Sequence, residues 1–173
     1  MNVELSNIDM ILCEMIGRMR NIVNINGKVK NNKVSKQTNN IIDVQGFVAE
    51  YAFCKHLNLF PDFDLTPRSG SYDALYKGYR YDIKSTTHKN GRLIATTKVN
   101  PDVDIYILAI VDVNKVEFIG YAFKEDFIKP ENISDLGYGK TYVLERNKLH
   151  KFKKWTHKQN TTKCKKIKNI QMK

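Results

Sequence analysis

The sequence predicts an α/β fold in which a mixed central β-sheet is flanked by helices. Two segments with the helical spacing of apolar residues come first, followed by a run at 79–86 that alternates between apolar and polar residues. The most apolar segment, DIYILAIV at 104–111, comes next and predicts a central strand. This order of helices and strands indicates one sheet of mixed direction with helices packed against it.

The first predicted helix spans residues 5–25. Ser6 and Asp9 have the spacing of a capping box at its start. Its apolar residues, which follow the helical period, are Ile8, Ile11, Leu12, Met15, Met19, Ile22 and Val23. Such a stripe is typical of a helix that packs on the domain core, the more common arrangement, or of one that pairs with another subunit.

A polar segment, NGKVKNNKVSKQTNN at 26–40, predicts a loop that could touch a phosphate backbone. A second helix is expected to begin near Asp43. Its apolar stripe contains Val44, Phe47, Val48 and Tyr51, and Glu50 falls at the margin of that stripe. A carboxylate at this margin either leans toward a site or lies on the surface as an ordinary glutamate.

Residues 72–76 and 79–86 predict a β-hairpin with Lys77-Gly78 as its two-residue loop. In this register Asp73 lies opposite Asp82, and the Cβ atoms of opposite residues are roughly 4.5–5.5 Å apart.

Lys84 projects from the same face as Asp82, because side chains repeat every second residue along a strand. Two carboxylates and an ammonium group therefore converge. They form either a surface ion-pair cluster or a site for magnesium, which one or two carboxylates usually hold together with a substrate phosphate. With a lysine beside it, such a site suits phosphodiester hydrolysis.

The rest of the chain predicts further short elements. VEFIGYAF at 116–123 predicts a strand, and KEDFI, which follows it, begins a short helix. TYVLERNKL at 141–149 fits either a last strand or a helix. The length favours a single domain over residues 1–145.

Positive charge is concentrated at the C-terminal end. Residues 146–173 hold eleven Lys and Arg and no Asp or Glu, whereas residues 1–145 hold eighteen of each, so the net charge of +11 arises in this basic segment. Such a segment attracts polyanions by counterion release, and Lys153, Lys154 and Trp155 are expected to contact nucleic acid. The alternative is a solvated tail that adds solubility.

Several function classes are disfavoured by composition. Three widely spaced cysteines and four scattered histidines do not form the pattern of a disulfide framework or a zinc site. Because no apolar run approaches the length of a membrane span and no secretory signal is visible, we expect a cytoplasmic protein.

Three short motifs resemble the PD-(D/E)XK nuclease superfamily. They are Glu50 in GFVAEYAF, Asp73 in SYDAL, and Asp82-Ile83-Lys84 in YDIKST. The resemblance implies a restriction-endonuclease-like core over residues 41–128. Where the family has a helix, residues 87–101 instead contain an Asn-Gly turn and β-branched residues, and Tyr72 replaces the motif's proline.

The resemblance also implies roles for these residues. Asp73, Asp82, Glu50 and the main-chain carbonyl of Ile83 would bind Mg²⁺, for which Mn²⁺ can substitute. Lys84 would position or activate the attacking water.

The sequence thus predicts a magnesium-dependent nuclease acting on DNA, an endonuclease of phage or bacterial origin, with RNA as another possible substrate and a homodimer as a possible state. Arg68 and Lys98 are further candidate contacts to nucleic acid. The alternative is a non-catalytic nucleic-acid-binding protein with a degenerate nuclease fold.

Overall fold

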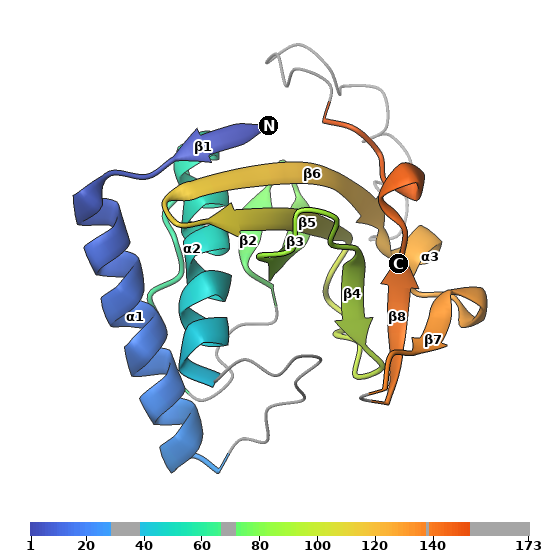
Figure 1. The fold of residues 1–173 in the computed structure, drawn as a ribbon, viewed down its shortest axis with the longest axis horizontal. Coiled ribbons are helices and arrows are strands. Elements are labelled where there is room, and N and C mark those ends of the chain that lie inside the picture. Colours follow the sequence, from blue (N-terminus) through green and yellow to red (C-terminus); the bar gives the residue numbers. More distant parts are fainter. Residues whose placement is uncertain (29–38, 67–71, 138, 153–173) are drawn as a thin grey trace, which may run out of the picture.

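The computed structural model describes residues 1–28, 39–66, 72–137 and 139–152 (Figure 1). The helices are α1 (Asn7–Asn26), α2 (Asn39–Leu57) and α3 (Lys124–Phe127), with 3₁₀ turns at Pro130–Asn132 and Arg146–Lys148. The strands are β1 (Asn2–Glu4), β2 (Ala74–Tyr76), β3 (Tyr79–Thr86), β4 (Leu93–Thr96), β5 (Ile105–Asp112), β6 (Lys115–Phe123), β7 (Ile133–Asp135) and β8 (Lys140–Leu144).

The strands form two sheets. The larger is a five-stranded mixed sheet in the order β1-β6-β5-β3-β2, and the smaller is an antiparallel sheet in the order β4-β8-β7. Figure 1 shows α1 and α2 at one side of the curled larger sheet, with the smaller sheet and α3 at the other. The predicted α/β class and mixed central sheet are confirmed, whereas the nuclease-like arrangement of the core stays a prediction.

Strand β5 is the centre of the larger sheet, as its apolar run predicted. It pairs parallel with β3 and antiparallel with β6. Ile107 and Ala109 belong to the core cluster that contains Phe53 of α2, whereas Leu108 and Ile110 belong to the cluster that faces the smaller sheet. A continuous apolar sequence suits a strand that is covered on both faces.

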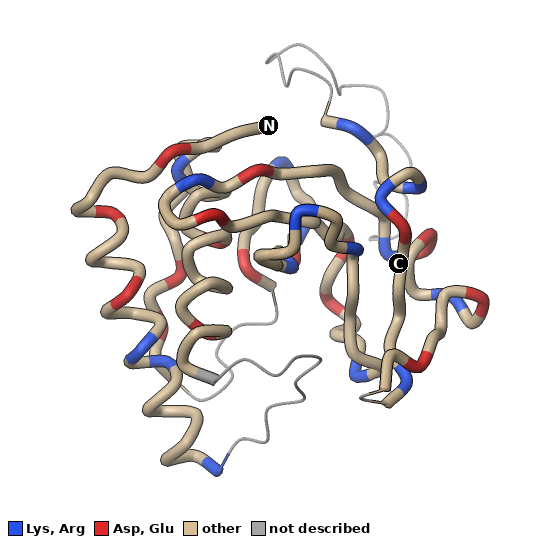
Figure 2. The backbone as a smooth tube through the Cα atoms, viewed as in Figure 1, with Lys and Arg blue, Asp and Glu red and all other residues tan. Residues whose placement is uncertain are grey.

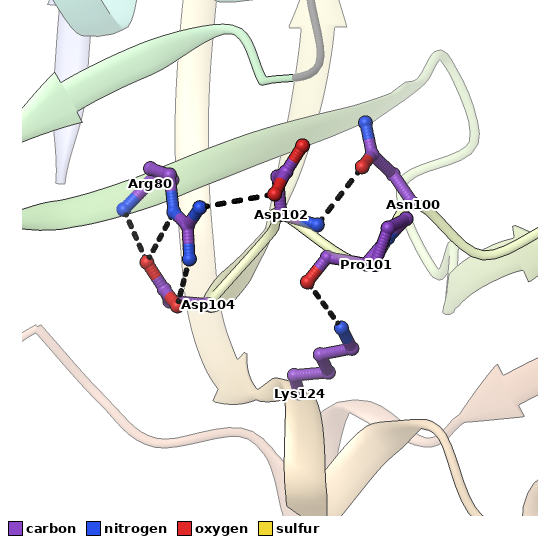
Figure 3. A network of polar contacts seen from close by, with 6 residues as sticks. All are labelled: Arg80, Asn100, Pro101, Asp102, Asp104 and Lys124. Atoms are coloured by element: carbon purple, nitrogen blue, oxygen red, sulfur yellow. Dashed lines mark hydrogen bonds and ion pairs between the residues drawn. The ribbon is translucent and has the colours of Figure 1, made fainter.

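An ion-pair network aligns the start of β3 with the start of β5 (Figure 3). The Arg80 guanidinium donates to both Asp104 carboxylate oxygens, at 3.0 and 3.1 Å, and to Asp102 at 3.2 Å. The main chain of Asp104 donates to the Arg80 carbonyl and accepts from the Lys124 N–H, each at 2.9 Å. The bidentate pair fixes the register of the two parallel strands.

The connection from β3 to β5 contains no helix. Residues 87–101, all of them described, include β4, which leaves the larger sheet and pairs with β8. The β-branched residues of this segment therefore build a strand. TYVLERNKL, which the sequence left undecided, forms β8 followed by a 3₁₀ turn.

Helix α1 begins with the predicted capping box. The face of the helix that packs on α2 is, however, not the face that carries most of the predicted apolar stripe. Its buried residues are Asp9, Cys13, Gly17 and Asn21. A Cβ atom on Gly17 would lie only 2.5 Å from Val44 Cα, so the backbones of α1 and α2 approach closely there. Five of the seven residues of the predicted stripe (Ile8, Ile11, Met15, Met19 and Ile22) are exposed, whereas Leu12 and Val23 are half-buried. The expectation that the stripe packs on the core is therefore wrong for most of its residues.

The packed part of the chain extends beyond the predicted boundary at residue 145. Leu149 is buried in the core, and the main chain of His150 exchanges hydrogen bonds of 2.8 and 3.0 Å with Tyr121 of β6. A Cβ atom on Gly120 would lie 2.7 Å from the His150 carbonyl oxygen, so glycine permits this contact. Residues 153–173 lie outside the described residues, as do residues 29–38 of the predicted loop. None of the described helices is both long and apolar enough to cross a membrane.

Asp9 accepts four hydrogen bonds, and the two from Tyr51 and Lys55 join α1 to α2. Its carboxylate accepts hydrogen bonds from the Ser6 N–H and hydroxyl at 2.8 and 2.7 Å, from the Tyr51 hydroxyl at 2.8 Å and from the Lys55 ammonium group. Burial alone would raise the pKa of Asp9, but these donors outweigh it and hold that pKa well below its usual range. The ionised carboxylate is therefore the form that stabilises the helix pair.

Asp9→Asn should lower the free energy of unfolding by about 1–3 kcal/mol at pH 7, because buried donors lose a charged acceptor. Since the folded pKa is depressed, this contribution is present above the unfolded pKa of about 3.9 and is lost as the pH falls toward the folded pKa. Urea unfolding at pH 7 and at pH 3 measures the difference, which should shrink at pH 3. The exposed Asp112→Asn is the control, and an equal loss at both pH values would contradict this role of Asp9.

Candidate metal and catalytic centre

The β2–β3 hairpin has the predicted two-residue turn. Lys77 and Gly78 have positive φ values of 51° and 80°, as a type I′ turn requires. The pairs 76–79, 75–80 and 74–81 form in the register expected from the sequence. This part of the site geometry is confirmed.

The predicted fourth pair, Asp73 with Asp82, does not form as a strand pair. Strand β2 begins at Ala74, and the Asp73 N–H donates to the Tyr81 carbonyl at 2.8 Å. The Asp73 side chain then takes the place of a main-chain acceptor, because its Oδ2 accepts the Ile83 N–H at 2.6 Å. Asp73 thus lies at the edge of β3, beside Ile83, instead of facing Asp82 across a ladder.

Asp82 and Lys84 project from one face of β3, as predicted. Lys84 Nζ lies 2.7 Å from Asp82 Oδ1, with 18% of the Asp82 side chain and 38% of the Lys84 side chain exposed. That oxygen is buried and already has a cation within hydrogen-bonding distance. On the neighbouring strand β5, Tyr106 is paired with Asp82. Burial raises the pKa of Tyr106 to about 12, and the negative charge of Asp82 contributes to this rise.

Glu50 reaches the same region from α2. Its Oε2 accepts from the Arg20 guanidinium at 2.7 Å, and the two side chains are only 16% and 18% exposed. Arg20 also donates to the Asp62 carbonyl at 2.8 Å and lies over the Phe47 ring, 4.6 Å from its centroid. The sequence analysis missed Arg20, because a helical stripe does not reveal which distant carboxylate an arginine will bind.

These groups form one electrostatic unit. Burial raises the pKa of Asp73 well above its usual value, and the nearby Glu50 and Asp82 carboxylates raise it further. Burial likewise raises the pKa of Glu50, against the opposing effect of Arg20. Burial would lower the pKa of Lys84, but Asp82 and Asp73 outweigh it and raise that pKa.

Negative charge is in excess at this centre. When all groups are ionised, the centre contains three carboxylates (Glu50, Asp73 and Asp82) and two cations (Arg20 and Lys84), which gives a net charge of −1. Burial is the main cause of the raised pKa values of Asp73 and Glu50, and the neighbouring carboxylates add to it. An added cation would offset the excess negative charge.

The carboxylates of this cluster are oxygen ligands of the kind that magnesium prefers, but they do not form a complete coordination shell. Within the described parts of the chain, no three His, Cys, Asp or Glu side chains are grouped so that they could hold one ion. Magnesium commonly uses one or two carboxylates and keeps several waters, so it does not need such a group. Asp82 Oδ1 already lies 2.7 Å from the Lys84 ammonium group, so an ion bound at Asp82 would share this carboxylate with Lys84.

The predicted nucleic-acid contacts are less well placed. Lys98 is exposed in the turn after β4, outside this cluster. Arg68, Lys153, Lys154 and Trp155 lie outside the described residues. The structure therefore brings together Glu50, Asp73, Asp82 and Lys84, with Ile83 bonded to Asp73 through its N–H, while the metal-binding role of the Ile83 carbonyl stays a prediction.

Comparisons with family models, curated proteins and solved structures return no match for this chain. Functional inference therefore depends on its own residues.

Arg20→Gln should lower the free energy of unfolding by about 3 kcal/mol, because it leaves the Glu50 carboxylate buried without its partner. Arg18→Gln is the matched control, since the Arg18–Glu14 pair is 59% and 55% exposed and such pairs contribute only about 0.3–0.5 kcal/mol. Urea unfolding of the two variants measures both effects. Equal stabilities would show that Arg20 does not anchor Glu50.

Proposed function

We propose that this chain is a magnesium-dependent nuclease that hydrolyses phosphodiester bonds in DNA and has a restriction-endonuclease-like core. One observation carries the proposal: Asp82 and Lys84 of β3 lie beside Asp73 and Glu50 of neighbouring elements in a cluster with excess negative charge. That charge favours a divalent cation, and a lysine at the same place favours a reaction that develops negative charge on phosphate.

The position of the cluster suits a polymeric substrate. Strand β2 pairs only with Tyr79–Tyr81, so the edge of β3 beyond Tyr81 meets no strand among the described residues. Asp73 lies at this edge, and the Lys84 side chain is 38% exposed. A phosphodiester backbone could therefore approach the carboxylates from the open edge of the sheet.

Each residue has a distinct role in this proposal. Asp73 and Asp82 would hold Mg²⁺ or Mn²⁺ together with water, while Glu50 and the Ile83 carbonyl complete its surroundings. The ion would supply charge stabilisation at the phosphate and a more acidic bound water. Lys84 would orient the attacking water by hydrogen bonding or stabilise charge on the phosphate oxygens. Arg20 would act through Glu50, as a positioning residue.

Charge separation over the chain supports binding to a nucleic acid. The basic segment at 146–173 accounts for the net charge of +11, whereas the proposed centre has excess negative charge. Lysines of the basic segment, including Lys153 and Lys154, would attract the backbone, and Trp155 could stack on an exposed base. Lys98 and Arg68 would add further contacts to the backbone.

The alternative is a non-catalytic nucleic-acid-binding protein with a degenerate site. One observation favours it: Asp82 and Glu50 are already paired with Lys84 and Arg20, respectively. In that case the cluster would stabilise the protein without an added ion.

A cleavage panel distinguishes the two functions. Supercoiled, linear, single-stranded and branched DNA, with an RNA of matched sequence, are incubated with Mg²⁺, with Mn²⁺ or with a chelator. We expect metal-dependent cleavage, and Lys84→Ala and Asp82→Asn should each reduce its rate by about 10²–10³-fold while binding is retained. Lys115→Ala, at the exposed first residue of β6, serves as the control.

Binding without cleavage in either metal, together with an Asp82→Asn variant that behaves like the parent, would support the non-catalytic alternative. Cleavage of RNA alone would change the substrate class but not the proposed chemistry.

A further inference from the structure

Helix α1 carries most of the exposed apolar surface of the described chain. Eleven large hydrophobic side chains are exposed among the described residues, and six of them belong to this one helix. These six are Ile8 (78% exposed), Ile11 (59%), Met15 (56%), Met19 (45%), Ile22 (56%) and Ile25 (60%). A continuous apolar face of this kind marks an interaction surface.

This face cannot turn inward within the same chain. The opposite side of α1, at Cys13, Gly17 and Asn21, packs on α2, where Val44 leaves no room for even a Cβ atom at Gly17. Figure 1 shows α1 as the outermost element on its side of the molecule, and the tube in Figure 2 shows residues of both charges along it. Each of the large side chains therefore forgoes the roughly 1.5–3 kcal/mol that burial would provide, unless another surface covers it.

A groove accompanies the exposed face. It has a volume of about 660 Å³ and is lined from α1 by Met10, Ile11 and Glu14 and from α2 by Ile41 and Val44. Its other lining residues are polar or charged: Asn7, Arg18, Asn40 and Gln45. Side chains from an approaching helix would fit into it.

One series of exposed positions along α1 has the same spacing in both directions. It consists of Ile8, Ile11, Met15, Arg18, Ile22 and Ile25, and Met19, which is 45% exposed, lies beside it. Their separations are three, four, three, four and three residues, the coiled-coil pattern of a helix seam. Because this series is unchanged on reversal, a twofold axis between residues 16 and 17 matches the face with itself. The facing pairs are then Ile8 with Ile25, Ile11 with Ile22, and Met15 with Arg18.

Charge selects the antiparallel direction. Glu14 and Arg18 form an exposed ion pair of 2.6 Å near the middle of the face. In the antiparallel arrangement Glu14 of one copy lies next to Arg18 of the other. In a parallel arrangement in equal register, Glu14 would meet Glu14 and Arg18 would meet Arg18, which is unfavourable.

We propose that α1 pairs in antiparallel direction with α1 of a second copy, and that this helix pair forms a symmetric homodimer. The contact is isologous, so it closes at two copies. A 20-residue helix is about 30 Å long, which gives an interface at the small end of the range for specific complexes. The dimer does not depend on the proposed nuclease activity.

Sedimentation of the full chain over about 1–200 μM tests the dimer, since weak interfaces lie in this affinity range. The parent should change from monomer to dimer mass with concentration. Ile11→Glu combined with Ile22→Glu should raise the dissociation constant at least about 100-fold, because four charges would enter the apolar seam. Ile133→Glu, at an exposed apolar position on β7, is the control and should dimerise like the parent.

Charge exchange and cross-linking test the direction. Glu14→Arg or Arg18→Glu alone should weaken the dimer, and the double exchange should restore it. When Ile11→Cys and Ile22→Cys variants are mixed under oxidising conditions, a disulfide should join one to the other. Disulfides within each separate variant and none between them would show a parallel pair and overturn the proposed geometry.

Two further outcomes would overturn the proposal. A monomer mass at every concentration would exclude the dimer. A monomer that sediments with anionic phospholipid vesicles, and loses this property with Ile11→Glu and Ile22→Glu, would show that the face binds a membrane surface.

Discussion

Burial of β5 on both faces is the constraint on which the rest of this structure depends. A strand with apolar residues at every position from Ile105 to Val111 must be covered twice. Helix α2 covers one face, while the smaller sheet and α3 cover the other. Strand β3 runs parallel beside β5. Because side chains along β3 alternate between the two faces of the sheet, Tyr81 and Ile83 point toward α2. Asp82 and Lys84 then project from the opposite face.

The polar centre is located where this covering ends. Strand β2 begins at Ala74, which pairs with Tyr81, so no β2 residue pairs with the part of β3 after Tyr81. There the Asp73 carboxylate accepts the hydrogen bond from the Ile83 N–H. Glu50 arrives from the margin of α2 and is held by Arg20 of α1. The cluster therefore combines residues from three parts of the chain at an edge of the sheet, where charged groups can retain some contact with water.

Local geometry explains which features the sequence could predict. The Lys77-Gly78 turn determines the hairpin register, because a two-residue turn with positive φ leaves few alternatives. Uninterrupted apolar residues identify β5, and the spacing of Ser6 and Asp9 identifies the start of α1. The two-residue period of a strand places Asp82 and Lys84 on one face, and this followed from the sequence as well.

Features that depend on distant partners could not be predicted in the same way. Strands β1 and β7 have three residues each, too few for a periodic pattern, and β4 pairs with residues far along the chain. Periodicity showed which residues of α1 share a face but not which face meets α2, a choice made by the close approach at Gly17. The bond between Arg20 and Glu50 likewise exists only after α1 and α2 have packed.

The short outer strands have a consequence for solubility during folding. Strands β1, β2 and β7 have three residues each and β4 has four, and these are the outer strands of the two described sheets. Long unpaired edges invite strands from other molecules and lead to aggregation, whereas edges this short offer few open hydrogen-bonding groups. His150 occupies part of the β6 edge that β1 leaves free. Apart from the edge of β3 beyond Tyr81, the described sheets therefore offer little edge for strand addition.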